Sequence, residues 1–281
     1  MNRNYKCRYT EVSIHNNKAV YLDNEKIRVG ILTGKGCDVF EILYKPNDTD
    51  IMLRTREGLD VFKGRVFSEQ RAKNYCEFYE GGWQDIIPSR AVWGGNIIDG
   101  DTAGESAAID WKYDIMKNEP DEVSLKCQAN LPVLPLYIEK TFTIKSNSST
   151  VVVSESVTNV CNEEISFTWT QHPAFGGAFL EPGVKVVLPV EFMFDYKNYV
   201  ENGSIHRYEY FYLARQFPAN NQTIDLTILP ERERSQSIFT TAMNIVHGKV
   251  ELINLKKNVQ LVMSWDKSTF PHLWYWLENT E

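Results

Sequence analysis

The sequence predicts a mostly β-sheet protein, and three observations lead to this prediction. Tyr, Phe and Trp make up 12% of the 281 residues, and many lie in segments where apolar and polar residues alternate, as they do in half-buried strands. Short apolar runs separated by turn-rich pieces begin close to the N-terminus. From Val123 onward, segments of strand length and turns follow one another at the spacing typical of β-sandwiches.

The predicted elements begin with a β-meander over residues 18–44, in which the runs AVYL, IRVGIL and VFEILY are separated by turns. One helix is predicted within residues 48–62. No linker-like stretch divides the chain, which predicts a single domain over residues 1–281. Later strands are expected within residues 151–153, 165–170, 184–194 and 248–265, with turns at residues 146–149 and 256–258.

The composition is typical of a folded protein that has no nucleic-acid partner. Hydrophobic residues make up 43% of the chain and charged residues 24%, and the mean hydropathy is −0.36, all near the averages for globular proteins. The 30 basic and 37 acidic residues give a net charge of −7. The basic residues form no run that could follow a phosphate backbone.

The sequence also predicts a soluble, cytoplasmic protein. The N-terminus has charged and amide side chains where a secretory signal has an apolar stretch, and no later segment approaches the ~18 apolar residues of a membrane-spanning helix. The five cysteines are widely spaced, without a CxxC pair. We therefore expect reduced thiols and no membrane partner. No particular oligomeric state is predicted.

The histidines do not predict a metal site, because none lies in HxH, HExxH or another spacing that brings two ligands to one metal. The GxSxG, GxxxxGK[ST] and GxGxxG signatures of common hydrolases, phosphate-binding proteins and dinucleotide-binding proteins are also absent from the sequence. We expect neither a metal nor a cofactor. The five histidines are His15, His172, His206, His247 and His272.

His172 is the most informative of these residues. Residues 165–172 alternate strictly, with apolar side chains on one face and polar ones, ending with Thr170 and His172, on the other. Pro173 ends the strand, so a group that titrates near neutral pH stands at the end of a hydroxyl-lined surface, where a polyol could bind. The structural alternative is a histidine satisfied by a neighbouring backbone group.

Three further segments have two interpretations each. Asp266 ends an alternating strand and shares its polar face, or it is a turn aspartate that caps the loop DKSTFP. Gly-rich and Trp-rich YEGGWQDIIPS and the segment FPHLWYW either fill the core or form walls on which a sugar stacks. In the first of these, the glycine pair suggests a tight turn that presents Trp83 and Gln84.

Four segments, in order, resemble the aldose 1-epimerases, or sugar mutarotases, in particular a divergent branch of mutarotase-like proteins. They are the opening meander, YEGGWQDIIPS, FTWTQHPAFG and SWDKSTFPHLWYW. The resemblance spans almost the whole chain. It implies a β-supersandwich of two large, mainly antiparallel sheets with few short helices, which binds a small-molecule sugar in a cleft.

The resemblance also implies roles for individual residues. In mutarotases a histidine protonates the ring oxygen of the sugar and a glutamate deprotonates the anomeric hydroxyl, without a cofactor. The motif TQHPAF assigns the acid to His172. The neighbouring motifs imply that the sugar is bound by Trp83, Gln84, Thr170 and Trp274.

The base is not assigned in this way, because the family's glutamate lies on a strand after the LWYW segment and this sequence ends at Glu281. A histidine that precedes a GE pair in relatives is replaced in AGES, which contains Glu105. Either the sequence lacks its C-terminal strands or another carboxylate serves as the base, for which Glu105 and Asp266 are candidates by their chemistry alone.

The function predicted from these residues is interconversion of the α and β anomers of a hexose or modified sugar. The alternative is a non-catalytic carbohydrate-binding protein on the same scaffold, because a fold does not fix its function. A purely structural β-protein is the third hypothesis.

Overall fold

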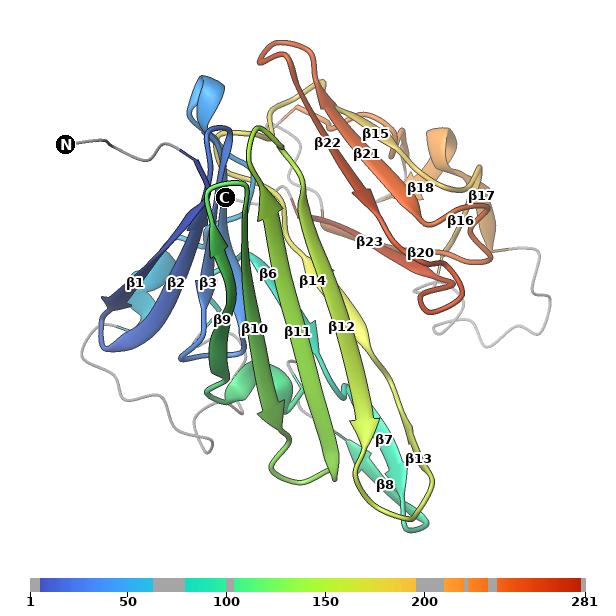
Figure 1. Cartoon of the computed structure of the whole chain (residues 1–281). Coiled ribbons are helices and arrows are strands. Elements are labelled where there is room, and N and C mark those ends of the chain that lie inside the picture. Colours follow the sequence, from blue (N-terminus) through green and yellow to red (C-terminus); the bar gives the residue numbers. More distant parts are fainter. Residues whose placement is uncertain are drawn as a thin grey trace. The chain divides into compact units, whose positions relative to one another are not determined.

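The computed structural model describes residues 6–62, 79–99, 104–195, 210–219, 222–231 and 237–278. The chain divides into two compact units, Met1–Phe179 and Leu180–Glu281 (Figure 1). The described residues are mainly in antiparallel strands, and their helical structure consists of short 3₁₀ turns, so the prediction of an all-β fold with few short helices is confirmed. In this part of the chain we find no helix with the length and apolar character needed to cross a membrane. The single domain over residues 1–281 stays a prediction.

The first unit is built on a seven-stranded sheet whose N-terminal part is the predicted meander. Its strand order is β1-β2-β3-β4-β6-β14, with β5 paired to β4. The strands are β1 (Arg8–Ile14), β2 (Asn17–Asp23), β3 (Ile27–Leu32), β4 (Asp38–Tyr44), β5 (Thr49–Asp50), β6 (Trp83–Ile86) and β14 (Thr170–Pro173). The last two strands are far apart in the sequence and adjacent in the sheet.

A four-stranded sheet with the order β12-β11-β10-β9 packs its apolar side chains against one face of the seven-stranded sheet. Side chains from β2, β3 and β4 meet those of β10 and β11 in one core, which includes Leu22, Val29, Leu125 and Phe142, all fully buried. We call this the inner face of the seven-stranded sheet and the opposite one its outer face. The strands are β9 (Lys112–Glu119), β10 (Glu122–Asn130), β11 (Leu136–Lys145) and β12 (Val151–Asn159).

A third sheet and three 3₁₀ turns complete the described part of the first unit. The sheet has the order β13-β7-β8. Its strands are β13 (Ile165–Phe167), β7 (Arg90–Trp93) and β8 (Asn96–Asp99), and the turns are η1 (Lys45–Asn47), η2 (Gly58–Phe62) and η4 (Ser106–Ala108).

The predicted helix within residues 48–62 is wrong for most of its length, because only η2 is helical. The preceding residues belong to β5 and to bridges with other segments. Leu53 donates its N–H to the carbonyl of Ala174 and accepts from the N–H of Gly82. These long-range bonds occupy the backbone groups that a helix would use, so tertiary pairing overrides local propensity.

The predicted strand over residues 165–170 is divided in the structure. β13 pairs with β7, and β14 pairs with β6. The break falls where Thr168 donates its N–H to the carbonyl of Arg90. The predicted alternation is confirmed: Phe167 and Trp169 pack against the core, while Thr168 is exposed.

The second unit has its own strands and its own core. Its sheets have the orders β15-β21-β22, β17-β16-β20-β23 and β18-β19. The core includes Met193, Leu226 and Ala242, all fully buried. The elements are β15 (Lys185–Val187), β16 (Phe192–Phe194), β17 (Phe211–Leu213), η5 (Ala214–Gln216), β18 (Phe217–Ala219), β19 (Gln222–Ile224), β20 (Ser237–Ala242), β21 (Lys249–Asn254), β22 (Val259–Ser264) and β23 (Leu273–Glu278). The hairpin predicted within residues 248–265 is β21 and β22.

The glycine pair before β6 makes the tight turn predicted for it. Gly81 and Gly82 have φ angles of 98° and 84°, which side chains rarely allow. A Cβ on Gly82 would lie 2.4 Å from the carbonyl oxygen of Val39, and one on Gly81 would lie 2.2 Å from that of Leu53. The turn therefore holds β6 against β4 and fixes the direction in which Trp83 and the following residues project.

Replacing Gly82 by Ala should destabilise the first unit, because the new Cβ meets backbone as well as a left-handed conformation. We expect a loss of about 2–4 kcal/mol in urea-induced unfolding. Gly95→Ala is the matched control: Gly95 has φ 75°, and a Cβ added to it would meet no atom within 4 Å, so it should lose about 1–2 kcal/mol from the conformation alone. Equal losses in the two variants would contradict the close approach at Gly82.

Candidate functional site

The candidate site is formed where β6 and β14 pair. Gln84 lies directly opposite His172 and Ile86 opposite Thr170, while Trp83 lies opposite Pro173. Directly opposite residues of an antiparallel pair project from one face, and neighbours along a strand project from opposite faces. His172, Thr170 and Gln84 therefore share the outer face. Trp83 belongs to the inner face, so the structure does not bring it together with His172.

Beside His172, the outer face carries a buried network that local sequence patterns did not reveal. Gln84 donates from Nε2 to Oδ2 of Asp38 at 3.0 Å, and Lys35 binds the same oxygen. Lys35 also pairs with Oε2 of Glu80 at 3.0 Å. All four residues are at most 3% exposed. One ammonium group is thus shared by two carboxyl groups.

The charges of this network balance if Glu80 holds a proton. Burial and the nearby Asp38 outweigh the effect of Lys35 and raise the pKa of Glu80 to about 8. Burial lowers the pKa of Lys35, but the two carboxyl groups outweigh burial and raise it above its ordinary value. Among the described residues, Glu80 Oε1, Asp38 Oδ1 and Gln84 Oε1 have no hydrogen-bond partner. A proton on Glu80 makes one of these three acceptors a donor.

His172 is half-buried beside this network. Its ring lies 6.2 Å from that of Tyr79, measured between centroids. Burial lowers the pKa of His172 below its usual value, and the carboxylate of Asp38 acts in the opposite direction. Burial is the larger of the two effects, so it favours the neutral imidazole more than Asp38 favours the protonated one.

A second buried network lies on the inner face of the same strand pair. Lys140 of β11 is fully buried and pairs with Asp85 and with Glu155, at 2.9 Å from the latter. Gln171 donates to both carboxyl groups and accepts from Nε1 of Trp83 at 2.6 Å. Burial and Asp85 outweigh the effect of Lys140 and raise the pKa of Glu155 to about 7. Trp83 thus lies beside a structural ion-pair network, with Lys140 Nζ 5.0 Å from its ring centroid.

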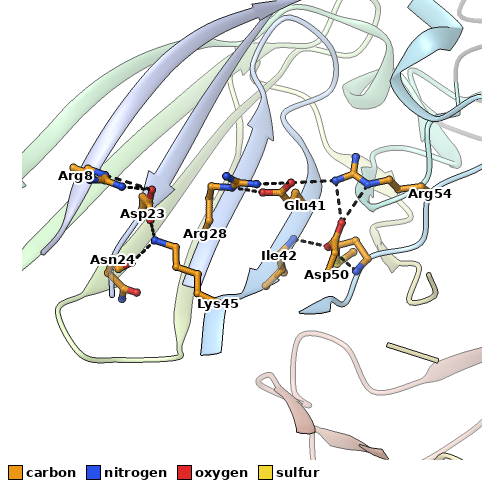
Figure 2. Close-up of polar contacts among 10 residues, drawn as sticks. Arg8, Asp23, Asn24, Arg28, Glu41, Ile42, Lys45, Asp50 and Arg54 are labelled. Carbon is orange, nitrogen blue, oxygen red and sulfur yellow. Dashed lines mark hydrogen bonds and ion pairs between the residues drawn. The ribbon is translucent and has the colours of Figure 1, made fainter. Parts of the chain in front are cut away.

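Ion pairs cover part of the outer face across β1 to β4, which also carries an apolar cluster that includes Leu32 and Phe40. Figure 2 shows two linked groups: one joins Arg8, Asp23 and Lys45, and the other joins Arg28, Glu41, Asp50 and Arg54. Arg54 also lies over the ring of Phe40, at 5.7 Å from its centroid. The outer face therefore carries both ion pairs and apolar side chains.

The two carboxylates considered as bases are held by loops. Glu105 accepts from the N–H groups of Val133, at 2.7 Å, and Leu134, and burial raises its pKa. In the second unit, Asp266 accepts from the N–H of Ser268 at 2.9 Å, and this bond lowers its pKa. Asp266 thus caps its loop, which is the structural alternative given for it above.

The remaining predicted site residue, Trp274, lies on β23 of the second unit. It pairs with Thr241 of β20 and is 53% exposed. Its ring meets that of Phe239 edge-on at 5.6 Å. Trp274 is therefore available on the surface of its sheet. His206 lies outside the described residues, and in the part of the chain that is described no three His, Cys, Asp or Glu side chains are grouped to hold a metal ion.

Comparison with known structures gives the fold. A galactose mutarotase-like protein from Clostridium acetobutylicum aligns with a TM-score of 0.61 and 13% identity, over 95% of this chain and 86% of that one. A protein described as a putative aldose 1-epimerase, from Escherichia coli K12, aligns with a TM-score of 0.56 and 13% identity, over 91% and 77%. This is a galactose mutarotase-like fold. The predicted resemblance is confirmed at that level.

A similar fold also occurs as part of a longer chain. A TPR-domain containing protein from Parabacteroides distasonis aligns with a TM-score of 0.59 and 11% identity, over 90% of this chain and 36% of that one. No protein-family model and no curated protein matches the sequence. At these identities the likeness establishes the fold, and the chemistry must be argued from the residues themselves.

The raised pKa values of Glu80 and Glu155 predict a stability that falls as pH rises. Each carboxyl group holds its proton in the folded protein above the value of 4.5 at which the unfolded chain releases it. The two groups contribute their full stabilisation of the folded protein below pH 4.5. This stabilisation is lost as pH rises through about 7 to 8. Glu80→Gln, which is neutral at every pH, should make the slope of the unfolding free energy shallower by up to about 1.4 kcal/mol per pH unit.

The measurement is urea unfolding at several pH values from 5 to 9. Glu139→Gln is the control, because Glu139 lies on an outward position of β11 and its pair with Lys126 lowers its pKa. Its variant should keep the wild-type slope in this range. A Glu80→Gln protein whose slope equals that of wild type would show that Glu80 is ionised throughout.

Proposed function

We propose that the protein is a sugar mutarotase of the aldose 1-epimerase type, in which His172 is the general acid. The observation that carries this proposal is the placement of His172. It stands at the end of β14, on the outer face of a mutarotase-like sheet, with Gln84 opposite it and Thr170 on the same face. The expected ligand is a hexose or a modified hexose.

In this proposal His172 has one chemical role, the transfer of a single proton. A protonated imidazole donates to the ring oxygen of the sugar, and removal of the proton from the anomeric hydroxyl opens the ring. Rotation about the C1–C2 bond and closure on the other face then give the second anomer. Such proton donation contributes typically ~10²- to 10⁴-fold to a rate. Thr170 would bind a sugar hydroxyl, because a hydroxyl group both donates and accepts, whereas Gln84, which the sequence also predicted to bind the sugar, is 1% exposed and bonded to Asp38.

A non-catalytic carbohydrate-binding protein is the second candidate, and a specific observation favours it. Glu105 and Asp266, the carboxylates considered as bases, each accept backbone N–H groups of a loop. A protein with the acid but without a placed base would bind sugar and leave its anomers unchanged. The exposed ring of Trp274 suits either function, since sugars stack on aromatic faces. The free thiols of Cys7, Cys37 and Cys127 are in keeping with the cytoplasmic location that we propose.

The test of activity is polarimetry on freshly dissolved α-glucose and α-galactose. A mutarotase should shorten the approach to equilibrium in proportion to protein concentration, and should reach a turnover of ~10 per second with its own substrate. Saturation-transfer NMR with the same sugars measures binding independently. Binding without acceleration would support the carbohydrate-binding protein and contradict the mutarotase.

His172→Asn should separate binding from catalysis. Asparagine can form hydrogen bonds but cannot deliver a proton at neutral pH. We expect the rate to fall ~10²- to 10⁴-fold, while sugar affinity stays within about tenfold, because a lost hydrogen bond costs ~0.5 to 1.5 kcal/mol.

The control is His247→Asn, the same change at an exposed histidine of the second unit, which should leave the rate as in wild type. Melting curves of both variants distinguish lost chemistry from unfolding. A His172→Asn protein with the wild-type rate and pH profile would remove His172 from the mechanism.

A further inference from the structure

Gln84 connects His172 with a charged residue from a distant part of the sequence. It lies directly opposite His172, where side chains project side by side with Cβ atoms ~4.5 to 5.5 Å apart. Its Nε2 donates to Oδ2 of Asp38 at 3.0 Å. Gln84 is 1% exposed and Asp38 is completely buried, so bulk water does not screen the charge of this carboxylate.

We propose that Asp38 is a positioning residue for His172: it holds Gln84 in place beside the imidazole and presents the buried negative charge that allows His172 to keep a proton. This inference rests on the proposed function for its catalytic meaning, since only there does His172 donate a proton. The link between the two residues is measurable without any sugar.

The binding pattern of Asp38 explains why its charge acts on His172. Lys35 and Gln84 both bind Oδ2, so two donors fix the position of this carboxyl group. Oδ1 has no hydrogen-bond partner among the described residues. Glu80 shares Lys35 but holds a proton below its pKa of about 8. Asp38 is therefore the carboxyl group of this network that is bonded to Gln84, and it is the one that acts on the pKa of His172.

Other charged groups on elements near β14 have partners of opposite charge. Asp85 of β6 points to the inner face, where it pairs with Lys140. Arg54, whose backbone bridges to the glycine turn before β6, pairs with Asp50 and Glu41. Burial lowers the pKa of the imidazole of His172, and the charge that opposes this is that of Asp38. Without that charge, burial should therefore lower the pKa of His172 further.

The experiment is an NMR titration of the histidine ring signals in the full chain, with His172 assigned by comparison with His172→Asn. In Asp38→Asn the titration midpoint of His172 should fall by about 0.5 to 1 pH unit, a three- to tenfold loss of proton affinity. Glu80→Gln is the matched control in the same network. Because Glu80 is already neutral, its variant should move the midpoint by less than about 0.2 unit.

Activity provides a second readout if the wild-type protein is a mutarotase. A general acid acts in its protonated form, so the rate falls as pH rises through its pKa. In Asp38→Asn the falling limb of the pH profile should move to lower pH by the shift measured by NMR, with KM within about threefold of wild type. A wild-type protein without mutarotation contradicts the proposed function alone, because the NMR shift is still measured.

A second substitution keeps the test possible if the Asp38→Asn protein does not fold. Asp38→Asn leaves Lys35 with Glu80, which can ionise in place of Asp38 and reduce the shift; Asp38→Asn combined with Lys35→Met removes both charges of the pair and the cation that favours ionised Glu80. The midpoint of His172 should fall in the double variant too, by less than about 1 pH unit because the positive charge of Lys35 is lost as well. A midpoint unchanged in the double variant, or moved as far by Glu80→Gln, would overturn the proposal.

Discussion

The first unit depends on the neutralisation of one buried ammonium group, that of Lys140. Inward positions of β11 alternate with outward ones, and Lys140 occupies an inward position between Ile138 and Phe142, inside the core. An unpaired charge at such a place would cost several kcal/mol. The partners come from β6 and β12, so the ion pairs join strands of both sheets. A slip of β11 by one residue would turn Lys140 outward and leave Asp85 without its cation.

The outer face repeats this arrangement one residue earlier in β6. Gln84 and Asp85 are neighbours, so they project from opposite faces, and each enters a network that contains one lysine and two carboxyl groups. Each network has one carboxyl group more than it has lysines. In each, one of the two carboxyl groups belongs to a glutamate with a raised pKa, about 8 for Glu80 and about 7 for Glu155. The strand pair that carries His172 is therefore fixed from both sides by clusters that are close to neutral. Such a frame suits a proton donor, because the field at the imidazole is set by a few fixed groups.

Local pattern predicted those features that depend on neighbours in sequence. The meander, the hairpin of β21 and β22, the polar face that ends at His172 and the glycine turn before β6 all follow from periodicity and turn chemistry. The helix predicted within residues 48–62 failed because Leu53 is bonded to Gly82 and Ala174, which lie far away in the sequence. The local sequence pattern also could not predict from which face of the sheet Trp83 projects, because this depends on the pairing of Trp83 with Pro173.

The network around His172 could not be found by spacing, because Lys35 and Glu80 are 45 positions apart and Lys35 lies in a turn where lysine is usually exposed. Lys140 did leave a signal: in LYIEKTFTIK it stands in the apolar register, at a place where a strand of the core has an aliphatic residue. A lysine in that register requires buried carboxyl groups on the facing strands. Once the strand pairing is known, the partners of Lys140 lead to β6, and so to the strand pair that carries the candidate acid.

The fold and the individual residues make separate contributions to the candidate site. The galactose mutarotase-like fold supplies the sheet, and His172 supplies a side chain of the type that titrates near neutral pH. Backbone N–H groups hold the carboxylates of Glu105 and Asp266 in loops, where burial raises the pKa of Glu105 and the bond to Ser268 lowers that of Asp266. His172, by contrast, lies opposite Gln84, which is bonded to Asp38. The pKa of His172 therefore depends on its surroundings, in which the effect of burial on the imidazole is opposed by a carboxylate from β4.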